Sequence, residues 1–258
     1  MKPKPIILPI LALLCTFAAA QTPPTAQQTL FDFRIDRKFK PPSIPLRTQK
    51  EVLSKVFRKY LTDEKQCSSN FNASSSNDPL KAARDAGQIV PSIVDTATGS
   101  FTAPGQAQQT VYVISVSECN ASHADNFGTK RVAIFSGQRL VADVDDNFNS
   151  SIVRKTDLNG DGLDELLMTG GDMNQGVAFE TATLLEFRNG RMRVIEDFGG
   201  VSEDSCASGL PSSGIKASVI SIKAAGLGDM PKFKMDNYRA NCRNPKRWRF
   251  LSTGKMPD

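Results

Sequence analysis

The chain has 258 residues, of which 40% are hydrophobic and 23% are charged, and it contains 18 glycines and 15 prolines. This is the composition of an ordinary globular protein, so it excludes collagen-like chains, wholly disordered chains and membrane proteins with many spans. The formal net charge of +5 is small for this length and gives little information about binding partners.

The first twenty residues have the organisation of a secretory signal peptide. Two lysines precede an almost entirely apolar run over residues 6–17, and the alanines at 18–20 supply the small residues that signal peptidase requires. A proline interrupts the apolar run, which is also shorter than the ~20 residues of a membrane-spanning helix. We therefore expect cleavage before Gln21, which leaves a secreted or periplasmic protein without a transmembrane segment.

Four cysteines remain after this cleavage, and an even number in an exported chain predicts two disulfides. Pairing Cys67 with Cys119 and Cys206 with Cys242 encloses the shortest loops and is favoured. Four cysteines allow three pairings, however, and the spacing alone does not decide between them. No two cysteines are spaced as C-x-x-C, so a zinc ribbon or a thioredoxin-like site is not indicated.

The chain that follows the signal peptide begins with residues 21–46, which are polar and rich in proline. Proline can neither continue a helix nor donate a hydrogen bond inside a sheet, so we expect a flexible arm here. Thr48 and Glu51 then match a capping box, and apolar residues follow at helical spacing on one face. This pattern predicts an amphipathic helix over residues 49–63, at the start of a single domain that spans residues 47–258.

From residue 110 onward the apolar period changes from 3.6 to 2, which is the spacing of β-strands. The clearest hairpin turns at Asn189-Gly190, because this dipeptide supplies the positive φ angles of a type I′ turn. The sequence therefore predicts a mainly β fold: an antiparallel β-domain of propeller-blade-like or sandwich-like hairpins with one N-terminal amphipathic helix. Strands are predicted over residues 111–116, 132–135, 140–141, 181–187, 192–198, 218–222 and 248–251.

The stretch over residues 157–167 carries the one pattern with a specific chemistry. Oxygen-bearing side chains stand at alternate positions, Gly162 allows a sharp bend, and an acidic residue closes the set. Three carboxylates and one neutral amide suit a hard cation, and Ca²⁺ fits better than Mg²⁺, which demands stricter geometry and keeps more water. Asp164 falls between ligand positions and is expected to point away from the ion. The predicted ligands are Asp157, Asn159, Asp161, Leu163 through its carbonyl, and Glu165.

This loop is not an EF-hand, because Met168 stands where that motif needs a bidentate glutamate. Together with the apolar strand that follows it, the loop resembles the calcium loop of FG-GAP (integrin-type) and VCBS repeats, over residues 148–171. In that family a strand–loop–strand unit binds Ca²⁺ within a propeller blade, and the resemblance implies the same ligand set. Only one copy is present, so we expect a single β-domain that contains one such loop. The alternative interpretation is an acidic surface turn.

No motif for catalysis accompanies this loop. His123 is the only histidine and lies in a polar stretch, and the chain has neither G-x-S-x-G nor a P-loop nor a dinucleotide fingerprint, so no catalytic residue is predicted. The sequence favours an exported calcium-binding protein, a non-enzymatic binding or cell-envelope module that binds a protein or a carbohydrate but no nucleic acid. The alternative is a secreted hydrolase that acts on carbohydrate through two acidic residues distant in sequence.

Overall fold

The computed structural model describes residues 28–35, 40–72, 75–105, 108–119, 129–146, 149–223 and 225–256. The predicted signal peptide, residues 21–27 of the predicted arm, and His123 lie outside the described residues. Within them the fold is mainly antiparallel β, as predicted. The elements are β1 (Gln28–Asp32), α1 (Leu46–Val56), η1 (Glu64–Gln66), α2 (Pro79–Ala86), β2 (Ile89–Gly99), β3 (Gln109–Glu118), β4 (Thr129–Ser136), β5 (Arg139–Asp146), β6 (Ser151–Thr156), β7 (Glu165–Asn174), β8 (Val177–Arg188), β9 (Arg191–Asp204), β10 (Ile215–Lys223), β11 (Lys232–Asn241) and β12 (Asn244–Thr253).

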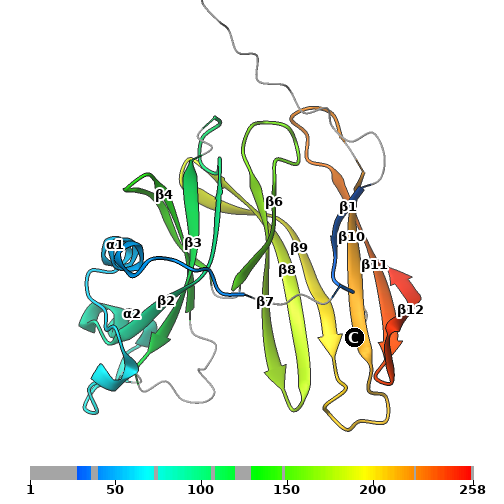
Figure 1. The fold of residues 1–258 in the computed structure, drawn as a ribbon, viewed down its shortest axis with the longest axis horizontal. Helices are drawn as coiled ribbons and strands as arrows, with labels where there is room; N and C mark the ends of the chain where they lie inside the picture. Colours follow the sequence, from blue (N-terminus) through cyan, green and yellow to red (C-terminus); the bar gives the residue numbers. More distant parts are fainter. Residues whose placement is uncertain are drawn as a thin grey trace, which may run out of the picture.

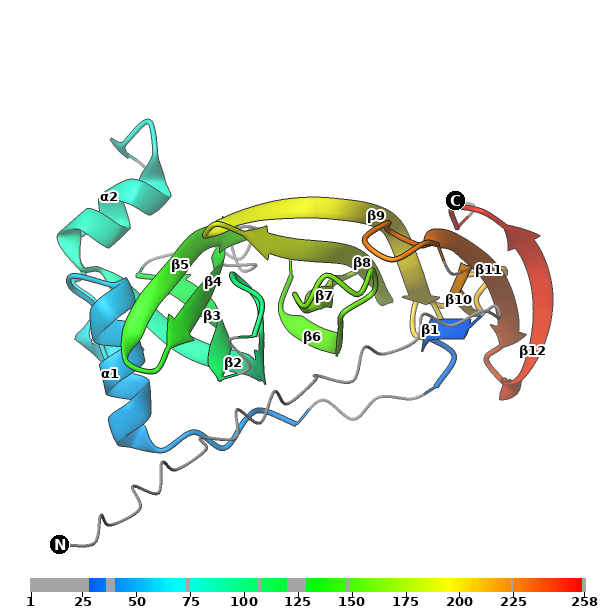
Figure 2. The same ribbon diagram turned by 90° about the horizontal axis from the view of Figure 1, so that it is seen from above.

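The strands form two sheets, and each sheet is built from consecutive hairpins (Figure 1). The small sheet has the order β2-β3-β4-β5, and the large sheet has the order β12-β11-β10-β9-β8-β7-β6, with β1 also paired to β10. The helices α1 and α2 lie beyond the small sheet at one end of the molecule, and β12 lies at the other end (Figure 2). The predicted turn between β8 and β9 is confirmed, since Asn189 and Gly190 have φ angles of 54° and 73°.

Residues 165–170 of β7 and 184–187 of β8 are all buried, and since neighbouring side chains of a strand point to opposite sides, both faces of the sheet are covered here. On β7, Leu166 and Met168 pack into a core shared with the small sheet. Between them, Leu167 packs into a second core with Leu30 of β1 and Ile220 of β10. A third core joins the helices to the outer face of the small sheet. The chain is therefore layered as helices, small sheet and curled large sheet.

The large sheet curls where β9 leaves β8 and meets β10. Phe198 and Val201 of β9 have no partner residue in β8, and such bulges increase the local bend of a strand. Strand β9 then pairs with β10 only through residues 202–204. Further along β10, its free edge pairs with β1. The first strand of the chain therefore completes the edge of β10 that β9 leaves open.

Part of the segment predicted to be a flexible arm is thus a strand, and for residues 28–35 that prediction was wrong. The prolines that suggested an arm lie outside this stretch. Leu30 and Phe33 are only 2% and 6% exposed and belong to the core of the large sheet. Burial of these apolar side chains offsets the entropy of ordering the segment.

Truncation of Leu30 tests this placement. We expect Leu30→Ala to lower the free energy of unfolding by about 2–5 kcal/mol, the usual cost of removing a buried leucine side chain. The matched control is Ile35→Ala, because Ile35 follows on the same segment and is 64% exposed. Urea unfolding of both variants measures the difference, and equal stabilities would mean that the segment is not part of the core.

The predicted helix over residues 49–63 is present with different limits, as α1 over Leu46–Val56. The predicted capping box does not form: the N-cap is Pro45, no side chain caps the helix, and Glu51 accepts a hydrogen bond from Arg47 Nε at 3.0 Å. Phe57 has an extended backbone and Tyr60 follows in a loop, yet both pack against the same core as the helix. Their spacing continued the helical pattern without a helix. In addition to α1, the structure has a second helix, α2, over Pro79–Ala86.

Two disulfides join Cys67 to Cys119 and Cys206 to Cys242, with Cα–Cα distances of 5.4 and 5.5 Å. This is the pairing favoured from the sequence. Two disulfides indicate an oxidising, extracytoplasmic environment, because thiols are kept reduced in the cytosol. Among the described residues no helix is long and apolar enough to cross a membrane.

Candidate functional site

Four of the five predicted ligands lie on the connection between β6 and β7, a tight turn over residues 157–164, and the fifth, Glu165, is the first residue of β7. Gly160 and Gly162 have φ angles of 72° and 84°, a left-handed conformation that residues with a Cβ rarely adopt. Asn159, Leu163 and Glu165 are buried. Gly160 and Gly162 are exposed, so the loop lies at the surface with some of its side chains packed into the protein, and the acidic surface turn stays the alternative interpretation.

The side chains of Asp157, Asn159 and Asp161 all accept hydrogen bonds from the loop's own backbone. The two carboxylate oxygens of Asp157 accept from the N–H groups of both glycines, at 2.7 and 2.9 Å. Asn159 and Asp161 each accept from the N–H group two residues further on, at 3.0 and 2.9 Å. Each oxygen keeps a further lone pair, because carbonyl and carboxylate oxygens accept at two positions. The curl of the loop is thus set by the same side chains that were predicted to bind an ion.

Two other loops hold the turn on either side. The N–H of Asp164 donates to Ser100 O at 2.6 Å, and the N–H of Ser100 donates to Asp164 Oδ2 at 2.8 Å. Lys155 Nζ lies 3.4 Å from the same carboxylate oxygen. On the other side, the N–H of Gly228 donates to Asn159 O at 2.7 Å. The side chain of Asp164 is therefore committed to Ser100 and Lys155, which agrees with its exclusion from the predicted ligands.

Glu165 is completely buried at the closing position of the loop. Its Oε2 accepts a hydrogen bond from the N–H of Leu158 at 2.7 Å, whereas its Oε1 is buried with no hydrogen-bond partner. Burial, together with the negative charges of Asp161, Asp157 and Glu186, raises the pKa of Glu165 to about 8, against the lowering effect of the hydrogen bond from the Leu158 N–H. A buried carboxyl oxygen without a hydrogen-bond partner is costly, and a bound cation would relieve that cost.

Strand β8 supplies two charged residues that the sequence analysis missed. Arg188 Nη2 lies 2.5 Å from Asp161 Oδ2, and Arg188 Nε lies 3.6 Å from Glu186 Oε1. The side chain of Glu186 is only 2% exposed. One signal could have identified it: this glutamate stands between two apolar residues, Leu185 and Phe187, in a predicted strand.

The donor set consists of hard oxygen atoms throughout, which suits Ca²⁺. Within the described residues, no three Asp, Glu, Cys or His side chains are placed to hold a metal ion together. The carboxylates are instead engaged with backbone N–H groups and with Arg188. The unpartnered Oε1 of Glu165 is the observation that fits a cation, and the residues present are consistent with one.

The other acidic run of the chain, residues 143–146, has a different character. Arg131 Nε lies 2.6 Å from Asp143 Oδ1, and Arg131 Nη1 lies 2.7 Å from Asp145 Oδ1. Arg84 also contacts Asp145, at 3.1 Å. These carboxylates are neutralised by arginines, so the run does not form a second candidate cation site.

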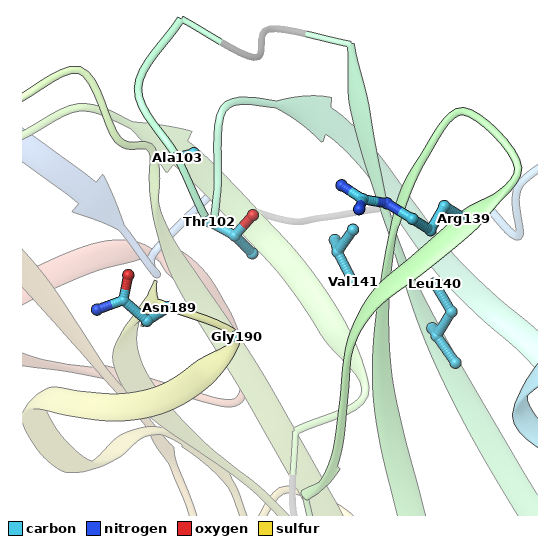
Figure 3. Close-up of a pocket in the computed structure, with 7 residues that line it drawn as sticks. All are labelled: Thr102, Ala103, Arg139, Leu140, Val141, Asn189 and Gly190. Atoms are coloured by element: carbon cyan, nitrogen blue, oxygen red, sulfur yellow. The ribbon is translucent and has the colours of Figure 1, made fainter.

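Two pockets lie away from the loop. One, with a volume of about 380 Å³, lies between the Asn189–Gly190 turn, residues 102–103 and the start of β5, and none of its lining residues is acidic. In the view of Figure 3, Thr102 lies between Asn189 and Val141. The second, of about 600 Å³, lies between β9 and β11, and its acidic lining residues are the consecutive Glu196 and Asp197. Neither pocket tests the alternative function, a carbohydrate hydrolase, which therefore stays a prediction.

The chain was also compared with known proteins. No protein-family model, no curated protein and no solved structure matches it. The resemblance of the loop to FG-GAP and VCBS repeats therefore stays a prediction, and the candidate site stands on its own residues and their contacts.

Proposed function

We propose that this protein is an exported, non-enzymatic β-protein whose β6–β7 loop binds one structural Ca²⁺ ion. The observation that carries the proposal is the buried, unpartnered Oε1 of Glu165 at the closing position of a loop lined with oxygen atoms. The ligands are the side chains of Asp157, Asn159, Asp161 and Glu165 and the carbonyl of Leu163.

Charge balance supports a divalent ion in this place. An ionised carboxylate that is buried without a partner costs several kcal/mol of the stability, and folded proteins avoid this by pairing the charge or by binding a metal. Ca²⁺ accepts six to eight oxygen ligands in flexible geometry, so it tolerates a set composed of carboxylates, an amide and a carbonyl. A bound ion would remove the penalty on Glu165 and offset the repulsion from Asp157 and Asp161.

The position of the loop supports a structural role. The turn is joined by backbone hydrogen bonds to Ser100, beyond β2, and to Gly228, between β10 and β11. An ion that fixes the turn therefore also fixes one connection from each sheet. Export is supported by the predicted signal peptide of residues 1–20 and by the two disulfides. If the protein is exported, we expect it to act at the cell envelope, with a protein or carbohydrate partner.

The buried glutamates of this region do not favour the hydrolase. A carbohydrate would have to reach its two catalytic carboxyl groups, which stand about 5–10 Å apart on either side of the bond that is cleaved. Glu165 is fully buried and the side chain of Glu186 is 2% exposed, so neither is open to a substrate.

Two substitutions within the loop, one of a proposed ligand and one of a residue that is not a ligand, test the proposal. Asp161→Ala removes a ligand, and we expect the Ca²⁺ affinity to fall by about tenfold or more because a charged ligand is lost. Asp164→Ala removes an equal charge from the same loop but no ligand. It breaks the bond to the Ser100 N–H, so we expect a loss of about 1–3 kcal/mol in stability with the Ca²⁺ affinity within twofold of wild type. Calorimetric titration with Ca²⁺ measures both variants, and equal affinities would contradict the proposed ligand set.

A further inference from the structure

Glu165 has a second buried glutamate beside it, on the neighbouring strand. Leu166 of β7 pairs with Leu185 of β8 in antiparallel register, so the next position along places Glu165 beside Glu186. Both side chains lie on the face opposite to Leu166 and Leu185, since neighbouring residues of a strand alternate. Side chains that are directly opposite on neighbouring strands have Cβ atoms about 4.5–5.5 Å apart, and two like charges in such a pair repel each other. The negative charge of Glu186 accordingly acts on Glu165.

Each of these two glutamates has one oxygen with a hydrogen-bond partner and one without. Glu186 Oε1 lies 2.7 Å from Arg193 Nε, on the paired position of β9. Glu186 Oε2 and Glu165 Oε1 are both buried, and neither has a hydrogen-bond partner. In metal sites, a hydrogen bond to one oxygen of a carboxylate commonly orients the other oxygen toward the metal.

The charges around the pair do not balance. Four carboxylates belong to this region: that of Glu165 and those of Asp161, Asp157 and Glu186, whose negative charges act on Glu165. The positive groups in contact with them are two guanidinium groups, those of Arg188 and Arg193. If all four carboxylates are ionised, an excess of two negative charges remains in a largely buried place, and one divalent cation would cancel it.

We infer that Glu186 is a further ligand of the cation, contributed by β8 through its unpartnered Oε2. The inference rests on the proposed function, and it changes the nature of the site. The ion would join the β6–β7 loop to the neighbouring strand of the large sheet instead of ordering the loop alone. Arg193 then serves as a positioning residue that fixes the carboxylate of Glu186, and Arg188 contacts Asp161 and Glu186 in the absence of the ion.

The alternative is that Glu186 is only the ion-pair partner of Arg193. The two roles differ in the number of water molecules on the bound metal, because a ligand that is removed is replaced by water. Eu³⁺ is a suitable probe, since it takes the same oxygen ligands as Ca²⁺ and its luminescence lifetimes in H₂O and D₂O report the bound water. A change that affects only packing leaves this number unchanged.

The experiment compares wild type with Glu186→Gln and with Glu196→Gln, a matched loss of charge on β9 outside the predicted site. We expect Glu186→Gln to weaken Ca²⁺ binding in calorimetry by tenfold or more and to add at least one water molecule to bound Eu³⁺. Glu196→Gln should stay within twofold of wild type with no added water. If Glu186→Gln does not fold, Glu186→Asp keeps the charge, withdraws the carboxylate and should also add water. Unchanged affinity and hydration in a folded Glu186 variant would overturn the inference while wild type still binds Ca²⁺, whereas wild type that binds no Ca²⁺ would overturn the proposed function.

Discussion

We expect replacement of Glu165 with glutamine to weaken Ca²⁺ binding by about tenfold or more and to leave the metal-free protein at least as stable as wild type at pH 7. Glutamine has nearly the same shape, and its carbonyl oxygen can still accept the hydrogen bond that the Leu158 N–H donates to Glu165 Oε2. It carries no charge, so it no longer places an unpartnered carboxylate in a fully buried position. Because one charged ligand is lost, a given Ca²⁺ concentration should raise the melting temperature of the variant less than it raises that of wild type.

The stability of the metal-free proteins should also depend on pH, in a direction that the pKa of Glu165 determines. The pKa of Glu165 is raised from 4.5 to about 8 in the folded protein. The folded state therefore holds the proton more tightly than the unfolded state does, and this contribution to stability is complete below about pH 4.5 and is lost as the pH rises through about 8. We expect metal-free wild type to lose stability over this range relative to Glu165→Gln. Urea unfolding in EDTA from pH 5 to pH 9 measures the difference, and parallel curves would show that Glu165 is not buried as a lone charge.

The second prediction with a large expected effect is that loss of the disulfide between Cys206 and Cys242 lowers the free energy of unfolding. The bond closes a loop with a sequence separation of 36 residues, for which the loss of chain entropy in the unfolded state predicts about 4 kcal/mol of stability. We expect the double variant Cys206→Ser, Cys242→Ser to lose roughly this amount in urea unfolding. Since domains of ordinary stability have only about 5–15 kcal/mol in total, the variant should be close to unfolding at 37 °C.

Calcium affinity serves as the control for the disulfide variant. Cys206 lies before the start of β10, whereas Gly228, which contacts the candidate loop, lies beyond the other end of that strand. The folded fraction of the variant should therefore bind Ca²⁺ as wild type does. A variant as stable as wild type would show that the bond contributes little, and a variant that is stable but no longer binds Ca²⁺ would show that the two ends of the sheet are coupled.

Local patterns were sufficient for much of the fold. The Asn189-Gly190 turn and the strands that it joins depend on residues close in sequence, and they were predicted with the correct type. The curl of the β6–β7 loop also depends on residues close in sequence, its own glycines and oxygen-bearing side chains, whereas strand β6 before the loop was not among the predicted strands. The disulfide pairing is the one that the shortest loops favoured, although the spacing alone did not decide between the three possible pairings.

What was missed depends on contacts between segments distant in sequence. Strand β1 exists because β10 offers an edge almost 190 positions further along, which no local pattern reveals. Strand β2 was missed because it contains Pro91, and proline is tolerated there because β2 is the edge strand of the small sheet. Glu186 became a candidate only when the pairing of β7 with β8 placed it beside Glu165.

Thermal unfolding of the wild-type protein with Ca²⁺ and with EDTA tests the central claim most directly. If the β6–β7 loop binds a structural Ca²⁺ ion, free Ca²⁺ at one hundred times its Kd should stabilise the folded state by about 2.7 kcal/mol, and the melting temperature should rise with each increase in Ca²⁺ concentration. Mg²⁺ at the same concentration should have a smaller effect, because it demands stricter geometry. A melting temperature that is the same in EDTA and in millimolar Ca²⁺ would contradict the account.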